Sequence, residues 1–476
     1  MSKTRKKRGA TRPSRRIRHL KGGKVLASGG FGCVFSPALK CEGAKQSPAN
    51  SVTKLMTDKH AIQEYEEIQQ IGAKLASIPR SKDYFLVFDA SLCRPQKLTQ
   101  QDLTRFSQTC SALPKNGITQ ENINRKLDQV LALTLPNGGL PVDDYMYACK
   151  SFAKLAHLHG HMVDLLRHGI LPMNKKRVYH CDIKDSNILV AEQDNNNILQ
   201  VRLIDWGLSH HYSPAQDAPF PKSWRNRPLQ FNVPCSVVLF TDTFYQKYTN
   251  YLANGGTLDG PSLKPFLSDY LKAWMTERGA GHYKFINEIV FKVYSHEVTS
   301  VSEKSKPAYI ETQVTLPLLI DYLEDVLTHY TKFKSNGDLN LREYLNNVFV
   351  HIVDVYGFVS SYYPLLEMLF DHIASLDANG EALFEAVANL FKRYMFAPRH
   401  APYSMPALYK DLERVGKCLE NVARNEPSKG GAQFKGAKRI ARMSKTKRRG
   451  AMTSVHLFRK KPNVKRFKHP IFLSLK

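Results

Sequence analysis

Apolar and polar residues follow different patterns in the early and later parts of this 476-residue chain. Residues 24–35 read as a strand, a glycine turn and a second strand. Short apolar runs at 51–56, 84–88 and 129–135 predict further strands. Residues 59–76 carry apolar side chains at helical spacing. The first part of the chain is therefore expected to be rich in strands.

Helical periodicity dominates after an Asn-Gly-Gly break at 137–139. The pattern predicts a long helix at about 143–167, then short strands around 178–190 and 200–204. From about 240 to 420 the chain reads as largely helical. This order predicts an α+β fold with a β-rich N-lobe and an α-rich C-lobe, and clefts between such parts commonly bind ligands.

The net charge of +27 is carried by the two ends of the chain. Residues 1–24 hold eleven Lys and Arg and no acid, whereas residues 421–476 hold seventeen and a single acid, Glu426. Such arms either keep a protein soluble or contact nucleic acid or an acidic surface. The basic runs at 5–8 and 445–449 could also act as nuclear-import signals.

Two further observations bear on location. No apolar stretch follows the N-terminal charges, so a secretory signal is not expected, and residues 348–370 contain acidic side chains that favour a buried core helix over a membrane span. The eight cysteines show no metal-knuckle spacing, which predicts free thiols in a reducing compartment. They stand at positions 33, 41, 93, 110, 149, 181, 235 and 418.

A glycine-rich turn is the first motif with chemical meaning: Ala27-Ser28-Gly29-Gly30-Phe31-Gly32-Cys33-Val34, between two predicted strands. Glycines allow backbone N–H groups to approach phosphate oxygens without hindrance from side chains. The alternative is an ordinary hairpin turn.

Lys54 closes a short strand and is the second candidate. A strand lysine can pair with phosphates and with a carboxylate on a neighbouring helix, although a single strand lysine is more often just exposed. Glu64 shares a helix face with Ile68 and Leu75, so it is the favoured partner, with Glu67 second.

The most specific motif is His180-Cys181-Asp182-Ile183-Lys184-Asp185-Ser186-Asn187. Here a carboxylate is followed by a cation two residues later and an amide five residues later. Phosphoryl transfer needs these three groups. A carboxylate orients the attacking hydroxyl and accepts its proton, a lysine offsets phosphoryl charge, and an amide oxygen binds a metal ion.

Asp205-Trp206-Gly207 follows eighteen residues after Asn187, at the end of an apolar run. A carboxylate at the end of a buried strand can chelate Mg²⁺. An isolated Asp-x-Gly is usually only a turn, so its weight comes from its short distance after the preceding motif.

These four motifs, in this order, resemble the eukaryotic-type protein kinase family, closely over residues 24–240 and more loosely to about 420. The resemblance implies ATP and Mg²⁺ as cofactors and a protein serine or threonine as acceptor. It implies catalytic roles for Asp182, Lys184, Lys54 and Glu64, and metal binding by Asn187 and Asp205. The nucleotide contacts implied are Ala27, Gly29, Gly30, Phe31, Gly32, Val34, Lys54, Leu133, Thr134, Leu135, Pro136, Asn187 and Asp205.

The chain departs from the family pattern at four places. Ala27 replaces the first loop glycine, Trp206 replaces a phenylalanine, and Cys181 replaces an arginine that receives an activating phosphate in many kinases. The Ala-Pro-Glu that closes the activation segment is absent, and residues 227–234 stand in its place. Control by phosphorylation of that segment is therefore not expected.

Asp354 opens an apolar segment that resembles the central C-lobe helix, whose aspartate braces the catalytic loop. An ordinary amphipathic helix is the alternative. If the resemblance holds, residues 235–345 are an insertion. The implied organisation is an arm at 1–22, an N-lobe at 23–135, a C-lobe at 136–420 and a tail at 421–476.

The glycine turn, the short lysine strand, the 227–234 segment and the basic tail are together similar to kinases of large nucleocytoplasmic DNA viruses. This similarity implies action in the host cytoplasm, a viral factory or the virion, with the nucleus as a further possibility. Three other functions remain open: an inactive nucleotide-binding scaffold, a small-molecule phosphotransferase, and a DNA-associated virion protein.

Overall fold

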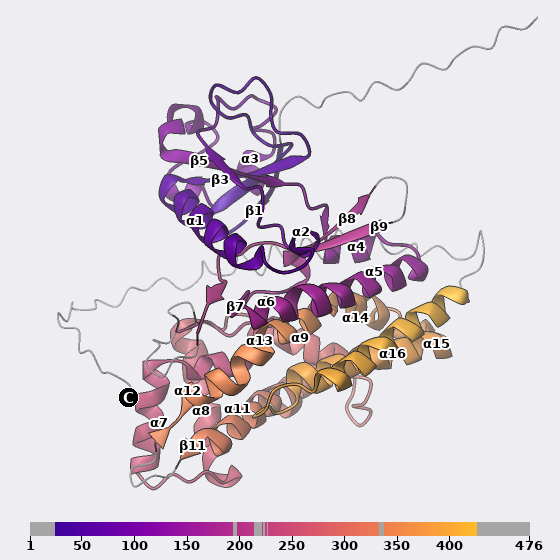
Figure 1. Cartoon of the computed structure of the whole chain (residues 1–476). Helices are drawn as coiled ribbons and strands as arrows, with labels where there is room; N and C mark the ends of the chain where they lie inside the picture. The colour runs from indigo at the N-terminus through magenta and orange to yellow at the C-terminus, as the bar shows by residue number, and fades with distance from the viewer. Residues whose placement is uncertain are drawn as a thin grey trace, which may run out of the picture. The chain divides into compact units, whose positions relative to one another are not determined.

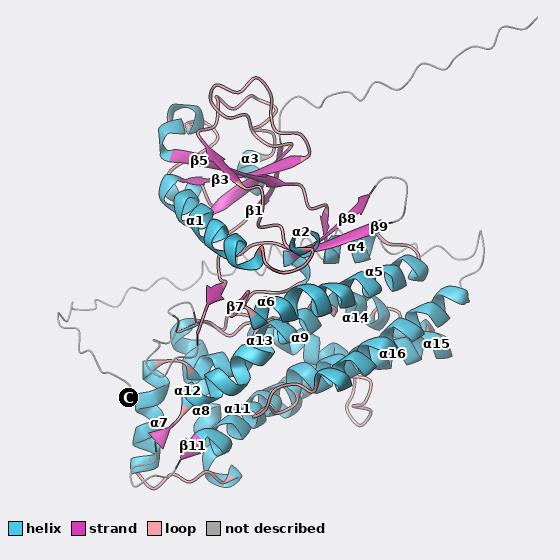
Figure 2. Cartoon of the chain, viewed as in Figure 1, coloured by secondary structure: helices cyan, strands magenta, loops and turns pink. Residues whose placement is uncertain are grey.

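The computed structural model describes residues 24–193, 198–213, 221, 224–225, 227–332 and 338–425. The predicted arm at 1–22 and most of the tail predicted at 421–476 lie outside these residues. The described chain forms two compact units. Unit 1 holds the residues up to Gln69 together with Phe88–Asn137, and unit 2 holds Gln70–Val87 together with the residues from Gly138 onward. The N-terminal region is built on a β-sheet and the C-terminal region is helical, as the sequence predicted (Figure 2).

Unit 1 is organised around one five-stranded antiparallel sheet, in which the strands lie in the order β1-β2-β3-β5-β4. The predicted strands at 24–35, 51–56 and 129–135 are confirmed. Ser28 and Cys33 face each other as the last pair of the first hairpin. The strands of the sheet are β1 (Lys24–Ser28), β2 (Gly32–Ser36), β3 (Ser51–Thr57), β4 (Ser91–Cys93) and β5 (Val130–Pro136).

The strand predicted at 84–88 is wrong. Helix α2 (Ser81–Tyr84) occupies its start, and Phe85 forms only a single bridge with Leu203, in unit 2. Residues Phe85, Leu86 and Val87 are all buried. A continuous apolar run indicates that a segment is buried on every side, but it does not distinguish a strand from a buried loop. The fourth strand of the sheet is instead β4, a few residues later.

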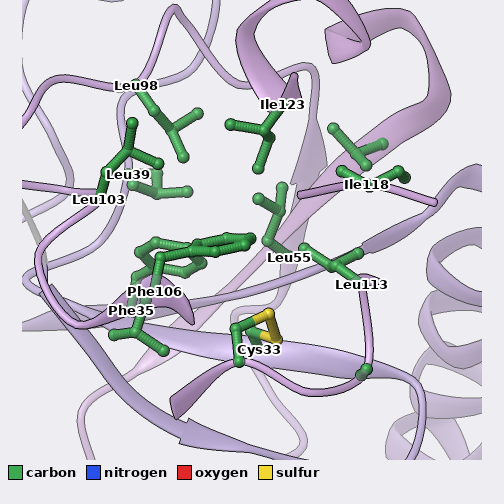
Figure 3. Packing of buried hydrophobic residues seen from close by; sticks show 14 of the residues in the cluster. Cys33, Phe35, Leu39, Leu55, Leu98, Leu103, Phe106, Leu113, Ile118 and Ile123 are labelled. Carbon is green, nitrogen blue, oxygen red and sulfur yellow. A yellow bond between two sulfur atoms is a disulfide. The ribbon is translucent and has the colours of Figure 1, made fainter. Parts of the chain in front are cut away.

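The core of unit 1 lies between the sheet and the irregular segment that connects β4 to β5. Phe35 from β2 and Phe106 from the short helix α3 (Phe106–Thr109) pack together there, with ring centroids 6.4 Å apart (Figure 3). The predicted helix at 59–76 is α1 (Asp58–Leu75), which begins in unit 1 and ends in unit 2.

Four of the eight cysteines form disulfides, so the expectation of free thiols is wrong for half of them. Cys33 is bonded to Cys110, and Cys41 is bonded to Cys93. Both pairs lie in unit 1, and their partners are 77 and 52 residues apart in sequence. Sequence spacing could not reveal these pairs because contact between distant segments is set by the fold. The other four cysteines, at 149, 181, 235 and 418, are free.

Unit 2 is mainly helical and carries a small antiparallel sheet in the order β6-β8-β9. The longest C-terminal helix, α16, packs against α5 and α15 (Figure 1). The strands of unit 2 are β6 (Leu140–Pro141), β7 (Val178–Tyr179), β8 (Ile188–Gln193), β9 (Ile198–Leu203), β10 (His210–His211), β11 (Thr331–Lys332) and β12 (Asp338–Leu339). Besides α2, its α-helices are α4 (Val142–Ala148), α5 (Phe152–Asp164), α6 (Leu171–Lys175), α7 (Asp242–Ala253), α8 (Gly260–Arg278), α9 (Tyr283–Tyr294), α10 (Lys306–Ile310), α11 (Leu316–Tyr330), α12 (Leu341–Tyr344), α13 (Val350–Ser360), α14 (Tyr363–Phe370), α15 (Ala378–Phe391) and α16 (Met405–Arg424).

The single long helix predicted at 143–167 is two helices, α4 and α5. Cys149 and Ser151 both adopt extended backbone angles, which interrupt the helical hydrogen bonds. The expected core helix within 348–370 is confirmed, because every residue of α13 except His351 is buried. Among the described residues, none of the helices has the length and apolar character needed to cross a membrane.

Candidate active site

Lys54 and Glu64 form an ion pair within unit 1. The Lys54 Nζ lies 2.7 Å from both carboxylate oxygens of Glu64, and both side chains are largely shielded from solvent. Lys54 lies in β3 between β2 and β5, and Glu64 lies on the first part of α1. The alternative partner, Glu67, instead accepts a hydrogen bond from Gln63. The structure therefore contains the pair that the sequence favoured.

The glycine-rich turn lies close to the same lysine. A Cβ added to Gly29 would stand 4.0 Å from the Lys54 Cε, and one added to Gly32 would stand 2.7 Å from the Leu55 carbonyl oxygen. Gly32 is therefore required because β2 approaches β3 too closely for a side chain. Within the turn, Gly29 N–H donates to the Gly32 carbonyl, while Phe31 is exposed. The backbone of the turn at Gly29 therefore lies close to the Lys54 side chain.

The predicted nucleotide contacts from Leu133 to Pro136 all lie within β5. Leu133 is fully buried and pairs with Lys54 of β3, and Thr134 pairs with both β3 and β4. The Thr134 hydroxyl lies 3.2 Å from that of Thr53. Leu135 and Pro136 continue the pairing with β3 to the end of the strand. Much of the backbone of Thr134 is therefore occupied in the sheet.

Asp182 is the centre of a buried hydrogen-bond network in unit 2. Its Oδ2 accepts from Lys184 Nζ at 2.7 Å and from Asn187 Nδ2 at 2.9 Å, and its Oδ1 accepts from Asn232 Nδ2 at 2.8 Å. Burial alone would raise the pKa of Asp182, but Lys184 and Asn232 outweigh burial and hold this pKa below its ordinary value. The carboxylate is therefore ionised and fixed in orientation.

Asp354 holds the backbone of the same loop, as the resemblance predicted. One of its oxygens accepts from the backbone N–H of Cys181 at 2.8 Å, and the other accepts from that of His180 at 2.9 Å. Asn174 donates to Asp354 as well, at 2.7 Å. Burial raises the pKa of Asp354, and the two N–H groups and His180 oppose that shift. The bracing aspartate is thus present on α13.

The approach of α13 to the loop is close enough to require glycine. A Cβ added to Gly357 would stand 2.6 Å from the backbone oxygen of Ile183. Gly357 lies one helical turn after Asp354, so the two residues fix one contact between the helix and the loop. The geometry of the loop around Asp182 is therefore set by a helix more than 160 residues later in the sequence.

Asn187 precedes β8 and Asp205 follows β9, at the same end of two paired strands. Ile188 of β8 pairs with Leu203 of β9, and the Ile204 N–H donates to the Asn187 carbonyl at 3.0 Å. Asp205 has a left-handed backbone with φ of 65° and is exposed. This conformation is unusual for a non-glycine residue and is often found at functional sites.

Trp206, the residue that replaces phenylalanine, is buried. Its ring lies 4.9 Å from the ring of His180 and 5.7 Å from that of Phe85, measured between centroids. The His180 Nε2 is 2.9 Å from the Ile204 carbonyl oxygen. These contacts tie the loop around Asp182 to the turn that carries Asp205.

Two residues that hold the loop around Asp182 were not predicted, and both lie in the 227–234 segment. Asn232 is buried and donates to both Asp182 and the Ile183 carbonyl. Arg227 is also buried, and its guanidinium donates to the Cys181 carbonyl at 2.9 Å. The positions of these two residues, about fifty residues after the loop, match no motif spacing. Their signal is the absence of the usual closing motif, which required another means of holding the segment.

The donor atoms of Asn187 and Asp205 suit a hard cation such as Mg²⁺. The Asn187 amide nitrogen is engaged with Asp182, which leaves the amide oxygen as the available ligand atom. Asp205 is exposed and lies two residues after Leu203, the residue that pairs with Ile188. Amide and carboxylate oxygens are the ligands that Mg²⁺ prefers. The residues present therefore fit the predicted metal.

A second group of possible ligands, Asp325, His329 and His400, lies elsewhere in unit 2. Their donor atoms lie within 4.8 Å of one another, but the two imidazole rings stack face to face with centroids 3.5 Å apart. Parallel rings direct their lone pairs alongside each other rather than toward one ion. Imidazole is also a poor ligand for Mg²⁺, so this group is not the predicted magnesium site.

The predicted site residues are thus assembled in two sets, each within its own unit. Lys54, Glu64 and the glycine-rich turn belong to unit 1, whereas Asp182, Asn187 and Asp205 belong to unit 2. Convergence of the two sets on one nucleotide stays a prediction. The chain matches no protein-family model, and no curated protein matches it either. Its function must therefore be argued from these two sets of residues.

Proposed function

We propose that this chain is a eukaryotic-type protein kinase that transfers the γ-phosphoryl group of ATP to a serine or threonine hydroxyl of a protein. The observation that carries the proposal is the network around Asp182. A carboxylate kept ionised by Lys184 and oriented by Asn187 and Asn232 matches the requirements for orienting a hydroxyl nucleophile.

The proposed reaction assigns one task to each group. Asp182 orients the acceptor hydroxyl and takes its proton as the new O–P bond forms and the bond between the γ-phosphorus and the β–γ bridging oxygen breaks. Lys184 lies beside Asp182 and offsets negative charge on the transferred group. Asn187 and Asp205 would hold Mg²⁺, which neutralises phosphate charge when it is bound. Lys54, held by Glu64, would contact the α- and β-phosphates.

Serine or threonine specificity rests on the resemblance of Lys184 to that kinase class. A viral origin, a cytoplasmic, virion or nuclear location, and DNA binding by the basic arms also remain proposals. The arms lie almost entirely outside the described residues. Deletion of 1–22 and 426–476 should abolish DNA binding and leave phosphotransfer intact if the arms and the catalytic body act independently.

The test compares the full chain with Asp182→Asn and Asp205→Asn in the presence of Mg²⁺, ATP labelled at the γ-phosphate and generic basic or acidic acceptor proteins. Each substitution should lower labelling by at least about a thousandfold, on the order of 4 kcal/mol in the barrier. Asp269→Asn is the matched control because Asp269 is highly exposed and its ion pair with Lys272 is long at 4.0 Å and therefore weak. Equal labelling by all four proteins would exclude this mechanism, and labelling of small metabolites in place of proteins would favour a small-molecule phosphotransferase.

A further inference from the structure

The glycine-rich turn is attached at both of its ends to one segment of unit 1. The turn is closed by the facing residues Ser28 and Cys33. The Ser28 Oγ accepts from the backbone N–H of Ser111 at 3.0 Å and from that of Ala112 at 3.2 Å. Cys33 is joined to Cys110 by a disulfide. Three consecutive residues, 110–112, therefore hold both sides of the turn.

The segment that carries residues 110–112 has little regular structure to hold it. Between β4 and β5 it contains the four-residue helix α3 and short 3-10 turns. It is connected to the sheet through the apolar core, where Phe106 meets Phe35, and through the disulfide. Figure 3 shows the sulfur atoms beside these two rings. The disulfide is therefore the one covalent link, among the described residues, between this segment and the strand that leaves the turn.

We propose that the disulfide between Cys33 and Cys110 has a functional role, because it fixes the glycine-rich turn in the conformation that binds the phosphates of ATP. The proposal rests on the proposed function. In the reduced chain the Ser28 contacts and the apolar packing of the unit 1 core remain, but no covalent bond holds the turn to residues 110–112. The turn then samples more conformations. Nucleotide binding must order the turn again, and the free-energy cost of that ordering makes binding less favourable. Reduction should consequently weaken ATP binding.

The chemistry needs a thiol reductant, such as a dithiol of low molecular weight. Its thiolate attacks one sulfur of the pair, the Cys33–Cys110 bond breaks, and a mixed disulfide forms. The second thiol of the reductant then displaces the protein sulfur. Two electrons pass to the protein, both cysteines end as thiols, and the reductant leaves as a cyclic disulfide.

The second disulfide provides an internal comparison. Cys41 and Cys93 are partly exposed, whereas Cys33 and Cys110 are buried, with 0% and 3% exposure. A buried disulfide reacts only when the surrounding structure opens, so the exposed pair should be reduced first. The Cys41–Cys93 pair joins the loop after β2 to β4 and does not include a residue of the turn. Its loss should leave the turn in place.

The first measurement counts thiols in the full chain, purified without reductant and alkylated in denaturant. Four alkylated cysteines, at 149, 181, 235 and 418, are expected, and eight would overturn the proposal. The second measurement compares oxidised and dithiol-reduced protein by titration with a fluorescent ATP analogue in Mg²⁺ and by hydrogen exchange of the peptide 24–36. Reduction should raise the dissociation constant at least tenfold and speed exchange at 28–33 by a similar factor.

Two double variants locate the effect. Cys41→Ser/Cys93→Ser should bind the analogue like the oxidised wild type and still respond to the dithiol. Cys33→Ser/Cys110→Ser should bind weakly and show no response. Because two buried serines can unfold the unit by themselves, the reduced wild type is the decisive sample. Equal binding and equal exchange of the oxidised and reduced wild type would overturn the proposal. Redox-dependent exchange without analogue binding in either state would instead refute the nucleotide function and leave the covalent attachment of the turn established.

Discussion

The two units of this molecule hold their functional residues in different ways. In unit 1, all four cysteines are paired in disulfides, and one pair fixes the glycine-rich turn. In unit 2 all four cysteines are free, and a buried aspartate, Asp354, holds the loop around Asp182 through backbone hydrogen bonds. The smaller unit carries a long irregular connection and relies on covalent links. The larger unit holds a buried aspartate in its interior by giving its oxygens hydrogen-bond donors.

Because of this difference, the candidate site residues of unit 1 and those of unit 2 should lose their arrangement under different conditions. Thiol reductants should lower the stability of unit 1, whereas substitution of buried polar side chains should lower the stability of unit 2. Separate unfolding transitions, followed by hydrogen exchange of peptides from each unit, distinguish these effects. The expected effects follow from the largest to the smallest.

Reduction of both disulfides should cost unit 1 the most stability. Closing a loop of 77 residues restricts the unfolded chain by up to about 4.5 kcal/mol in the chain-entropy model. The denaturant midpoint of unit 1 should fall, while that of unit 2 stays constant. The control is Cys418→Ser, a free cysteine on α16, which should change neither transition. A fall confined to unit 2 on reduction would contradict the comparison.

Asp354→Ala should destabilise unit 2 by about 4 kcal/mol, because two buried backbone N–H groups and Asn174 lose their acceptor. Urea unfolding followed in unit 2 peptides measures this change. Asp321→Ala is the matched control, since Asp321 on α11 is partly exposed in its ion pair with Lys264 and should contribute less than about 1 kcal/mol. Similar losses from the two variants would mean that Asp354 does not brace the loop.

Gly357→Ala should destabilise unit 2 by about 2 to 3 kcal/mol, since the new methyl group would press on the Ile183 backbone oxygen. Gly160 on α5 is the control because a Cβ there meets nothing within 4 Å. Gly160→Ala should stabilise the unit by about 0.5 to 1 kcal/mol through helix propensity. Opposite signs for the two glycines, read from unfolding midpoints, are the expected result.

Acidification should weaken unit 2 through His159. Burial lowers the pKa of His159 to about 4, and its two ring nitrogens are engaged by the Leu412 carbonyl and the Tyr362 hydroxyl. Below the ordinary histidine pKa of about 6.5 the unfolded chain takes up a proton that the folded chain refuses, so stability falls as the pH drops from 6.5 toward 4.

Between pH 7 and pH 5, protonation of His159 in the unfolded chain should lower the free energy of unfolding by about 2 kcal/mol. The interval from the ordinary pKa of about 6.5 down to pH 5 is about 1.5 pH units, at about 1.36 kcal/mol each. His159→Gln should lower stability at pH 7 and flatten this part of the pH dependence. An unchanged slope in the variant would show that another group is responsible.

Asn232→Ala should have the smallest effect, a loss of about tenfold in kcat/KM or about 1.4 kcal/mol. Because the Asn232 amide helps lower the pKa of Asp182, its removal should raise that pKa. The acidic limb of the pH–rate profile should therefore move to higher pH. A loss of activity without this movement would assign Asn232 a role in folding alone.

Much of the site could be predicted because its residues are close in sequence. Asp182, Lys184 and Asn187 lie within six residues, and Lys54 and Glu64 lie on adjacent elements. A strand or helix carries such groups to one place through its own local geometry. The misread run at 84–88 shows the limit, because local apolar character reports burial but does not report the backbone hydrogen bonds that define a strand.

The sequence by itself determined the mixed α+β class, the strand, turn and helix that present Lys54 and Glu64, and the spacing of the loop around Asp182. The packing of distant segments sets which cysteines are paired, and it brings Asn232 and Arg227 against the loop around Asp182. The physical reason is distance along the chain. Local propensity and periodicity act over a few turns, whereas a disulfide between residues 77 positions apart, or an amide fifty positions from its carboxylate, forms only when the packed core brings the two segments together.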